Sequence, residues 1–274
     1  MTIENNKVMT GGLRVLGGDV RTSDGPLITI ITVVFNGAAT LEHTILSVVE
    51  QTYKNIEYIV IDGGSTDGTL NILRKYEDKI DFWVSEKDAG IYDAMNKGIA
   101  LATGEYIGLL NSDDFFANSE VLEKIAAHIK QANVDAVFSN LDIVDAGNQD
   151  KVLRKYRVSK LTNFLLRIGV MPPHPTLYCK KSCYVTAGFY RTDYRIAADF
   201  EMFVRLLIKH NITWSFFNEV TVKMRTGGVS NNGWKSKFVV NQEIIRACVD
   251  NGLYTNAFLI MLKLPIRLRE RFYK

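Results

Sequence analysis

The chain has 274 residues, of which 47% are hydrophobic and 23% charged, which is typical of a folded protein with one large or two small domains. A net charge of +3 gives no support to nucleic-acid binding, and no apolar run approaches the ~20 residues of a membrane-spanning helix. The three cysteines lack zinc-like spacing, and the first 26 residues lack the apolar core of a signal peptide. We therefore expect a cytoplasmic protein with reduced thiols.

The predicted elements alternate between strands and helices along the first half of the chain. Residues 1–26 indicate a flexible tail that ends at Gly25-Pro26. A β-branched run over 27–35 predicts a buried strand, and apolar residues at helical spacing over 41–49 predict a helix. Further strands are predicted at 56–61, 82–84, 106–111 and 134–138, with helices that end near 76 and span 91–102 and 119–131.

This alternation predicts an α/β fold with a mostly parallel central sheet and helices on both of its faces. Ligands of such sheets bind beyond the carboxyl ends of the strands. Polar side chains gather at those ends in this sequence, namely Asn36, Asp62, Asp88, Asp113 and Asp114. The regular alternation fades after about residue 140, so the second half is expected to be organised differently.

The stretch Asp62–Thr69 (DGGSTDGT) follows the second predicted strand. It matches neither the GxGxxG fingerprint nor a P-loop, so the sequence does not favour a dinucleotide or ATP site. Its glycines permit a ligand to approach the backbone closely. A plain strand-to-helix turn capped by Ser65 or Thr66 is the alternative.

Two adjacent carboxylates, Asp113 and Asp114, follow the strand predicted to run into Asn111. Like charges resist burial, so a turn with local hydrogen bonds or a bound cation is expected here. Mg²⁺ is typically held by one or two carboxylates together with substrate phosphates. A cation at this site would therefore arrive with a phosphorylated ligand.

Several other residues admit a structural and a chemical role. Asp88 could favour a helix N-terminus or bind a ligand, and Asp199 could cap a helix or act as a general base. His174, between prolines, is more often structural than catalytic in such a setting. Arg225 precedes Gly227 and Gly228, a combination suited to gripping phosphate.

Taken together, these stretches resemble the family-2 glycosyltransferases, which are inverting enzymes of the GT-A fold that transfer a sugar from a nucleotide diphosphate to an acceptor. The resemblance covers residues 27 to about 230. It rests on seven stretches in the order of the family, which are TVVFN (32–36), IDGGSTDGT (61–69), EKDAGIYDAMNKG (86–98), LNSDD (110–114), HP (174–175), ADFEMF (198–203) and RTGGVS (225–230).

The resemblance implies a role for each matching residue. Asp199 is the implied general base, and His174 and Glu201 are the implied acceptor contacts. Asp113 and Asp114 are the implied ligands of Mn²⁺ or Mg²⁺. The implied nucleotide-sugar contacts are Val33, Asn36, Asp62, Asp88, Asn111, Ser112, Arg225, Gly227 and Gly228. Two positions depart from the family pattern, since Gly63 and Asn111 stand where aspartates are common.

The resemblance also implies a domain plan. We expect a GT-A-type domain over 27–230, with a nucleotide-sugar-binding half over 27–140 and a smaller acceptor-binding half over 141–230. Residues 231–274 are expected to form a helical, basic C-terminal extension. No Q-x-x-R-W signature of processive enzymes occurs, so one sugar per cycle is expected.

The implied donor is a UDP-sugar, and the implied acceptor is a glycan or a polyprenyl-diphosphate-linked sugar of a bacterial surface polysaccharide. Two alternatives remain at this point: a sugar-phosphate nucleotidyltransferase, and a non-catalytic nucleotide-sugar- or glycan-binding module of the same fold. The first would be expected to carry a basic, glycine-rich loop after the first strand, which is not found. Asn111 keeps the second open.

The charge is distributed unevenly. Residues 151–167 carry six basic side chains and no acid, and residues 263–274 carry five basic and one acidic, which leaves −7 for the rest of the +3 total. Both stretches interleave basic with apolar residues. They predict either peripheral contact with anionic lipid on the inner face of the cell membrane, or an ordinary solvated face or a C-terminal helix that packs on the domain.

Overall fold

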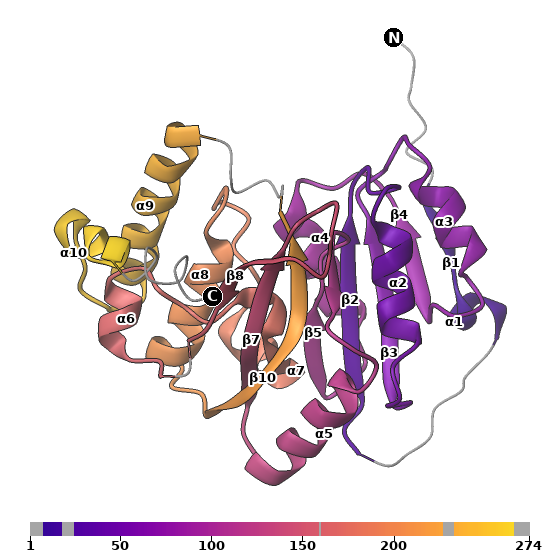
Figure 1. Ribbon diagram of the computed structural model, residues 1–274, viewed down its shortest axis with the longest axis horizontal. Coiled ribbons are helices and arrows are strands. Elements are labelled where there is room, and N and C mark those ends of the chain that lie inside the picture. The colour runs from indigo at the N-terminus through magenta and orange to yellow at the C-terminus, as the bar shows by residue number, and fades with distance from the viewer. Residues whose placement is uncertain (1–7, 18–24, 159, 227–232, 266–274) are drawn as a thin grey trace. The chain divides into compact units, whose positions relative to one another are not determined.

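The computed structural model describes residues 8–17, 25–158, 160–226 and 233–265, without the side chains of 233–235 (Figure 1). Residue contacts divide the chain into two units, Met1–Lys130 and Gln131–Lys274. Each unit is described by itself.

The first unit has the strand–helix alternation that the sequence predicts. Its described strands are β1 (Met9–Gly11), β2 (Ile28–Val34), β3 (Ile56–Asp62), β4 (Phe82–Ser85), β5 (Tyr106–Leu109) and β6 (Asp114–Phe116). Its described helices are α1 (Leu13–Leu16), α2 (Leu41–Val49), α3 (Thr69–Lys75), α4 (Ile91–Leu101) and α5 (Val121–Ala132), the last of which ends just past the division.

The sheet of the first unit has the order β1-β4-β3-β2-β5. β2 pairs in parallel with β3 and β5, and β3 pairs in parallel with β4, whereas β1 runs antiparallel to β4. Every residue of β2 is buried, which requires cover on both faces of the sheet. Helix α4 packs on β2 and β3 (Figure 1), where Gly98 leaves room for Ile31 of β2. The predicted α/β fold with a mostly parallel core is confirmed.

The prediction of a flexible tail is wrong for residues 8–17. β1 extends the sheet at β4, and α1 follows it. The guanidinium of Arg14 pairs with the buried carboxylate of Glu57 on β3, which also accepts a hydrogen bond from Thr29 Oγ1 at 2.5 Å. A buried carboxylate is stable only when it is paired and hydrogen-bonded. The segment is therefore held by an electrostatic partner that lies far away in the sequence.

The second unit is built around the long strand β7. Its described strands are β7 (Ala136–Val144), β8 (Val152–Tyr156), β9 (Tyr178–Lys180) and β10 (Trp214–Arg225). β7 pairs in parallel with β10 and antiparallel with β8 and β9. The described helices are α6 (Asn163–Arg167), α7 (Lys181–Ala187), α8 (Ala198–Val204), α9 (Gly233–Asp250) and α10 (Ala257–Met261), with a 3₁₀ turn at His174–Thr176.

Helix α8 has two carboxylates, Asp199 and Glu201, in its first turn. Almost all of its side chains are buried, and it continues into a π-helical segment at Arg205–Lys209. It packs against α9. Such π-helical segments are frequent at functional sites.

Candidate active site

The loops that follow β2 and β3 are joined by side-chain-to-backbone hydrogen bonds. Asn36 has a φ of 50°, a left-handed conformation that asparagine tolerates. Its backbone N–H donates to Ser65 Oγ at 2.7 Å, and its side-chain Oδ1 accepts from the N–H of Thr66 at 2.9 Å. The turn over 62–69 is therefore fixed before any ligand binds.

Asp62 at the end of β3 is fully buried. Its carboxylate accepts hydrogen bonds from both the hydroxyl and the N–H of Ser65, and from Ser85 Oγ at 2.5 Å. Val33 is buried within β2 beside it, so that only its backbone could contact a ligand. In this structure, Asp62 anchors the loop that the sequence predicts to face the nucleotide base.

Asp88 lies directly over Gly63. Its Oδ1 accepts from the N–H of Gly90 at 2.9 Å, and its Oδ2 occupies the space that a Cβ at position 63 would need. Burial raises the pKa of Asp88. The missing aspartate at position 63 thus has a physical reason, because the carboxylate of Asp88 already fills that space.

Residues 111–114 form a turn that leads into β6. Asp114 is fully buried, its N–H donates to the carbonyl of Asn111 at 3.0 Å, and Asn111 Nδ2 donates to its Oδ2 at 3.3 Å. Thr44 Oγ1 bonds the carbonyls of Ser112 and Asp114 at 2.9 and 2.7 Å. The Asp114 carboxylate is buried in the turn and is therefore less accessible than that of Asp113, and its role as a metal ligand stays a prediction.

Asp113, in the same turn, is partly exposed, as are Asn111 and Ser112. The described residues contain no group of three or more His, Cys, Asp or Glu that could hold a metal ion. A single accessible carboxylate fits a cation that takes its remaining ligands from substrate phosphates and water. Asp113 therefore suits Mg²⁺ or Mn²⁺ that binds together with a diphosphate.

In the second unit, Asp199 stands in the first turn of α8 and is partly exposed. It is not the helix cap, because Ala197 occupies that position. Asp199 Oδ1 accepts from the N–H of the next residue, Phe200, at 2.7 Å. Burial raises the pKa of Asp199 to about 6. A carboxylate with this pKa is ionised at neutral pH and more basic than a solvated aspartate, as a general base requires.

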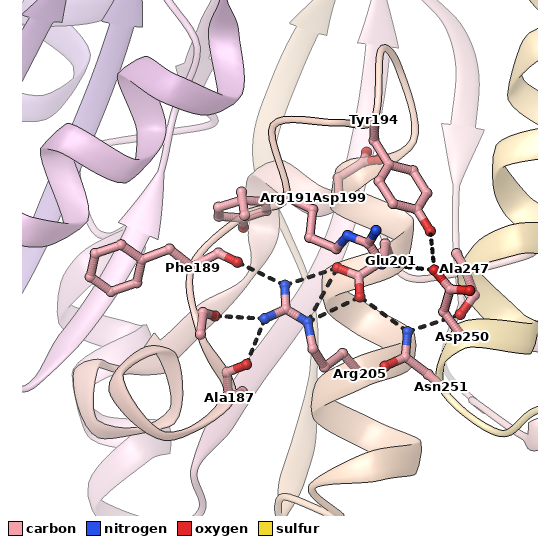
Figure 2. Close-up of polar contacts among 12 residues, drawn as sticks. Ala187, Phe189, Arg191, Tyr194, Asp199, Glu201, Arg205, Ala247, Asp250 and Asn251 are labelled. Carbon is pink, nitrogen blue, oxygen red and sulfur yellow. Dashed lines mark hydrogen bonds and ion pairs between the residues drawn. The ribbon is translucent and has the colours of Figure 1, made fainter.

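Glu201, for which an acceptor contact is predicted, is buried in this structure, and that contact stays a prediction. Its side chain is 1% exposed and is paired with Arg205, whose Nε and Nη2 donate to it at 3.0 and 2.8 Å (Figure 2). Asn251 Nδ2 donates to its Oε1 at 3.0 Å. Arg205 also donates to the carbonyls of Ala187 and Phe189 at 2.6 and 2.8 Å. Glu201 thus belongs to a buried network that holds the 187–189 loop.

His174 is also buried, in the 3₁₀ turn before β9. Its Nε2 shares a hydrogen bond of 2.8 Å with the hydroxyl of Tyr190, and the two rings meet edge to face. Burial lowers the pKa of His174 to about 4, so the ring is neutral at physiological pH. The burial of His174 and its bond to Tyr190 fit the structural alternative, and its acceptor contact stays a prediction.

Arg225 ends β10 and is buried, while Gly227 and Gly228 lie outside the described residues. Their diphosphate-binding role stays a prediction. Sequence reasoning missed Glu243 of α9, which accepts hydrogen bonds from the backbone in front of α8. No local signal points to Glu243, because it lies 46 to 48 residues beyond the amides that it bonds.

Comparisons with known proteins identify the family of the chain. The model of the glycosyl transferase family 2 matches residues 29–185, more than half of the chain. An uncharacterized glycosyltransferase of Mycobacterium tuberculosis is 34% identical over 184 residues, which cover 67% of this chain and 70% of that protein. A PGL/p-HBAD biosynthesis glycosyltransferase of Mycobacterium bovis is 27% identical over 225 residues, covering 81% of this chain and 83% of the relative.

Two solved structures share the fold. S. aureus TarS 1-349 in complex with UDP-GlcNAc has a TM-score of 0.65 at 18% identity, with 83% of this chain and 68% of that chain covered. The mannosyltransferase PcManGT of Pyrobaculum calidifontis, in complex with GDP-Man and Mn2+, has a TM-score of 0.61 at 20% identity, with 86% and 66% covered. On the family match and these relatives, the chain belongs to glycosyl transferase family 2 and is a glycosyltransferase.

Proposed function

We propose that this glycosyltransferase moves one hexosyl or N-acetylhexosaminyl unit from a UDP-sugar to a hydroxyl of a glycan or polyprenyl-diphosphate-linked acceptor, with inversion at the anomeric carbon. The observation that carries the proposal is Asp199, a carboxylate that caps no helix and whose pKa is raised to about 6. The family match supports transfer over nucleotide-sugar synthesis and over a non-catalytic module.

In the proposed reaction, Asp199 takes the proton of the acceptor hydroxyl while the hydroxyl oxygen bonds the anomeric carbon. The bond from that carbon to the diphosphate oxygen breaks in the same step, so a single displacement inverts the centre. Asp113 would hold Mn²⁺ or Mg²⁺, which stabilises negative charge on a departing diphosphate. At neutral pH, Asp199 is mostly ionised and ready to accept the proton.

The choice of donor rests on the first unit and on its structural relatives. The preformed turn at 62–69, with Asp88 beside it, presents glycines and carboxylates where a nucleotide could approach the backbone. UDP-GlcNAc is bound in the TarS structure, and Mn²⁺ with GDP-Man in PcManGT. We take UDP as the nucleotide and a divalent cation as the cofactor.

A thermal-shift panel of nucleotide sugars with Mn²⁺ tests the donor. A donor present at 100 times its Kd should stabilise the protein by ~2.7 kcal/mol, and EDTA should remove much of the shift. Release of UDP from the best donor then reports turnover. Equal thermal shifts for GDP- and UDP-sugars would overturn the donor assignment. A thermal shift that EDTA leaves unchanged would overturn the metal assignment. Pyrophosphate formed from a sugar phosphate and UTP would instead identify a nucleotidyltransferase.

We place the protein in the cytoplasm, because its three cysteines are all free thiols. None of the described helices is both long and apolar enough to cross a bilayer. Around α10, Phe258, Met261 and Leu264 are 71%, 62% and 53% exposed, and the basic stretch 263–274 overlaps this segment. We propose peripheral contact of this segment with anionic lipid.

Co-sedimentation with vesicles checks this contact. Binding should increase with the phosphatidylglycerol content of the vesicles and weaken in high salt, because the attraction is partly electrostatic. Phe258→Ala should reduce binding, whereas Val185→Ala, at a residue exposed on α7, should leave it unchanged. Equal binding to neutral and anionic vesicles would contradict the proposal.

A further inference from the structure

Helix α8 starts without a capping side chain of its own. Ala197 occupies the cap position, and no side chain at that position bonds the helix. The backbone N–H groups of the residues in front of the helix also need hydrogen-bond acceptors. In this protein, an acceptor for the segment in front of the helix comes from α9.

That acceptor is the carboxylate of Glu243. Its Oε1 accepts from the N–H of Arg195 at 2.7 Å, and its Oε2 accepts from the N–H groups of Ile196 and Ala197 at 2.9 and 2.8 Å. Hydrogen bonds to an ionised carboxylate are roughly twice as strong as neutral ones. Three consecutive amides are thus fixed by one side chain, immediately before the helix turn that bears Asp199.

A second bond ties the same two helices on the other side of Asp199. Asn251, at the end of α9, donates from Nδ2 to Glu201 Oε1 at 3.0 Å and to the carbonyl of Ala247 at 2.9 Å (Figure 2). Glu201 is in turn fixed by Arg205. Helix α9 therefore holds the backbone before Asp199 and a side chain after it, which defines the position of the carboxylate between them.

We propose that Glu243 is a positioning residue for catalysis: it fixes the 195–197 backbone so that Asp199 is held ready to take the acceptor proton. The proposal rests on the proposed function, in which Asp199 is the general base. It assigns a role to the C-terminal helix α9, which lies beyond the residues matched by the family model. Glu243 itself touches no substrate in this role.

The electrostatics around Asp199 give the proposal a signature in pH. The negative charge of Glu243 adds to burial in raising the pKa of Asp199. The charge of Asp199 also acts on Tyr190, but burial raises the pKa of Tyr190, so its hydroxyl stays neutral. His174, which is hydrogen-bonded to Tyr190, is neutral as well. The charge of Arg205, which lowers the pKa of Tyr190, is paired with that of Glu201. Glu243 is therefore the charged group whose removal should lower the pKa of Asp199.

Glu243→Ala and Glu243→Gln test the proposal, with Gln242→Ala, at an exposed neighbour on α9, as the matched control. The reaction followed is UDP release from the UDP-sugar that gives the largest thermal shift. Glu243→Ala should lower kcat about 10- to 100-fold with the donor KM unchanged, because a misplaced base loses rate and not donor binding. Glu243→Gln should lose less, since one amide oxygen can still accept hydrogen bonds.

Two readouts separate positioning from a general loss of folded protein. The acid limb of the kcat–pH profile, which reports the base in the bound complex, should move to lower pH in both Glu243 variants and stay in place in Gln242→Ala. Amide hydrogen exchange at 195–200 should accelerate in the Glu243 variants alone. If Glu243→Ala does not fold, Glu243→Gln carries the same two measurements.

The outcomes distinguish this inference from the proposed function. Asp199→Asn with wild-type turnover would remove the general base, and the proposed function would fail in that respect. If Asp199→Asn is inactive while the Glu243 variants keep wild-type kcat, acid limb and exchange rates, the base assignment stands and the positioning role is overturned. Slower turnover with an unmoved acid limb would also overturn the role, because it indicates only a loss of folded enzyme.

Discussion

A carboxylate that serves as a base is a destabilising feature of the fold that surrounds it. The pKa of Asp199 is raised from 3.8 to about 6, so the folded protein disfavours the charged form that chemistry would use. Hydrogen bonds from the backbone N–H groups of Phe200 and of Asp199 itself offset this only in part. The buried Glu201 shows the opposite solution, because Arg205 and Asn251 neutralise and bond it.

Replacing Asp199 by asparagine should therefore have opposite effects on rate and stability. Loss of the general base should lower kcat by about 10²- to 10⁴-fold. An acid whose folded pKa is raised costs stability as pH rises from its unfolded pKa through about 6, so the neutral amide should stabilise the protein at pH 7.5 by about 1–3 kcal/mol. Urea unfolding at pH 7.5 and 4 checks this, since the gain should vanish at the lower pH.

At the scale of elements, the loops after β2, β3 and β4 form one connected structure. Ser65 bonds both Asp62 and the N–H of Asn36, so the loops after β2 and β3 are locked together. Asp88, after β4, fills the space above Gly63. The loop geometry is therefore set by a few polar side chains and by one position where a side chain has no room.

Gly63→Ala should disturb this arrangement through Asp88. The new Cβ would overlap Asp88 Oδ2, so the carboxylate must move, at a cost of about 1–2 kcal/mol. If Asp88 holds the donor, UDP-sugar affinity should fall about tenfold with it. Gly68→Ala is the matched control, because its Cβ would lie 3.4 Å from the Cβ of Ala38, in ordinary contact.

A double-mutant cycle locates the origin of the effect. In the Asp88→Ala background, Gly63→Ala should cost no further stability, because the overlapping carboxylate is gone. Additive losses from the two substitutions, in urea midpoints or in donor titrations, would show that Gly63 matters for another reason.

At the scale of the whole molecule, the proposed chemistry is divided between two units. Donor contacts are assigned mostly to 1–130, and the base with its supporting helix to 131–274. Each set of contacts is built from hydrogen bonds within its own unit, as those of Asn36 and Glu243 show. Substitutions in the two units should therefore separate into donor-binding and turnover effects.

Calorimetric titration of the UDP-sugar checks this division. Glu243→Ala and Asp199→Asn should bind the donor within about twofold of the wild-type Kd, whereas Gly63→Ala should not. A large loss of donor affinity in both second-unit variants would contradict the division, because it would place donor contacts beyond the first unit.

Much of the first unit could be predicted because its signals are local. β-branched runs such as 28–34 and helical spacing such as that in 91–101 belong to single segments, and the structure confirms them. Other contacts join residues that are far apart in the sequence. Arg14 pairs with Glu57, and Asn251 donates to Glu201, and hydrophobic periodicity cannot predict such pairs.

Hydrophobic periodicity predicts the α/β class and most elements between residues 27 and 138, and short stretches kept in order indicate the family. Which of the chemically suitable side chains are accessible depends on the folded chain. It enclosed Asp114, Glu201 and His174, and it left Asp113 and Asp199 partly exposed. The physical reason is that burial and hydrogen-bond partners, which set the pKa and reach of a carboxylate, are properties of the packed chain.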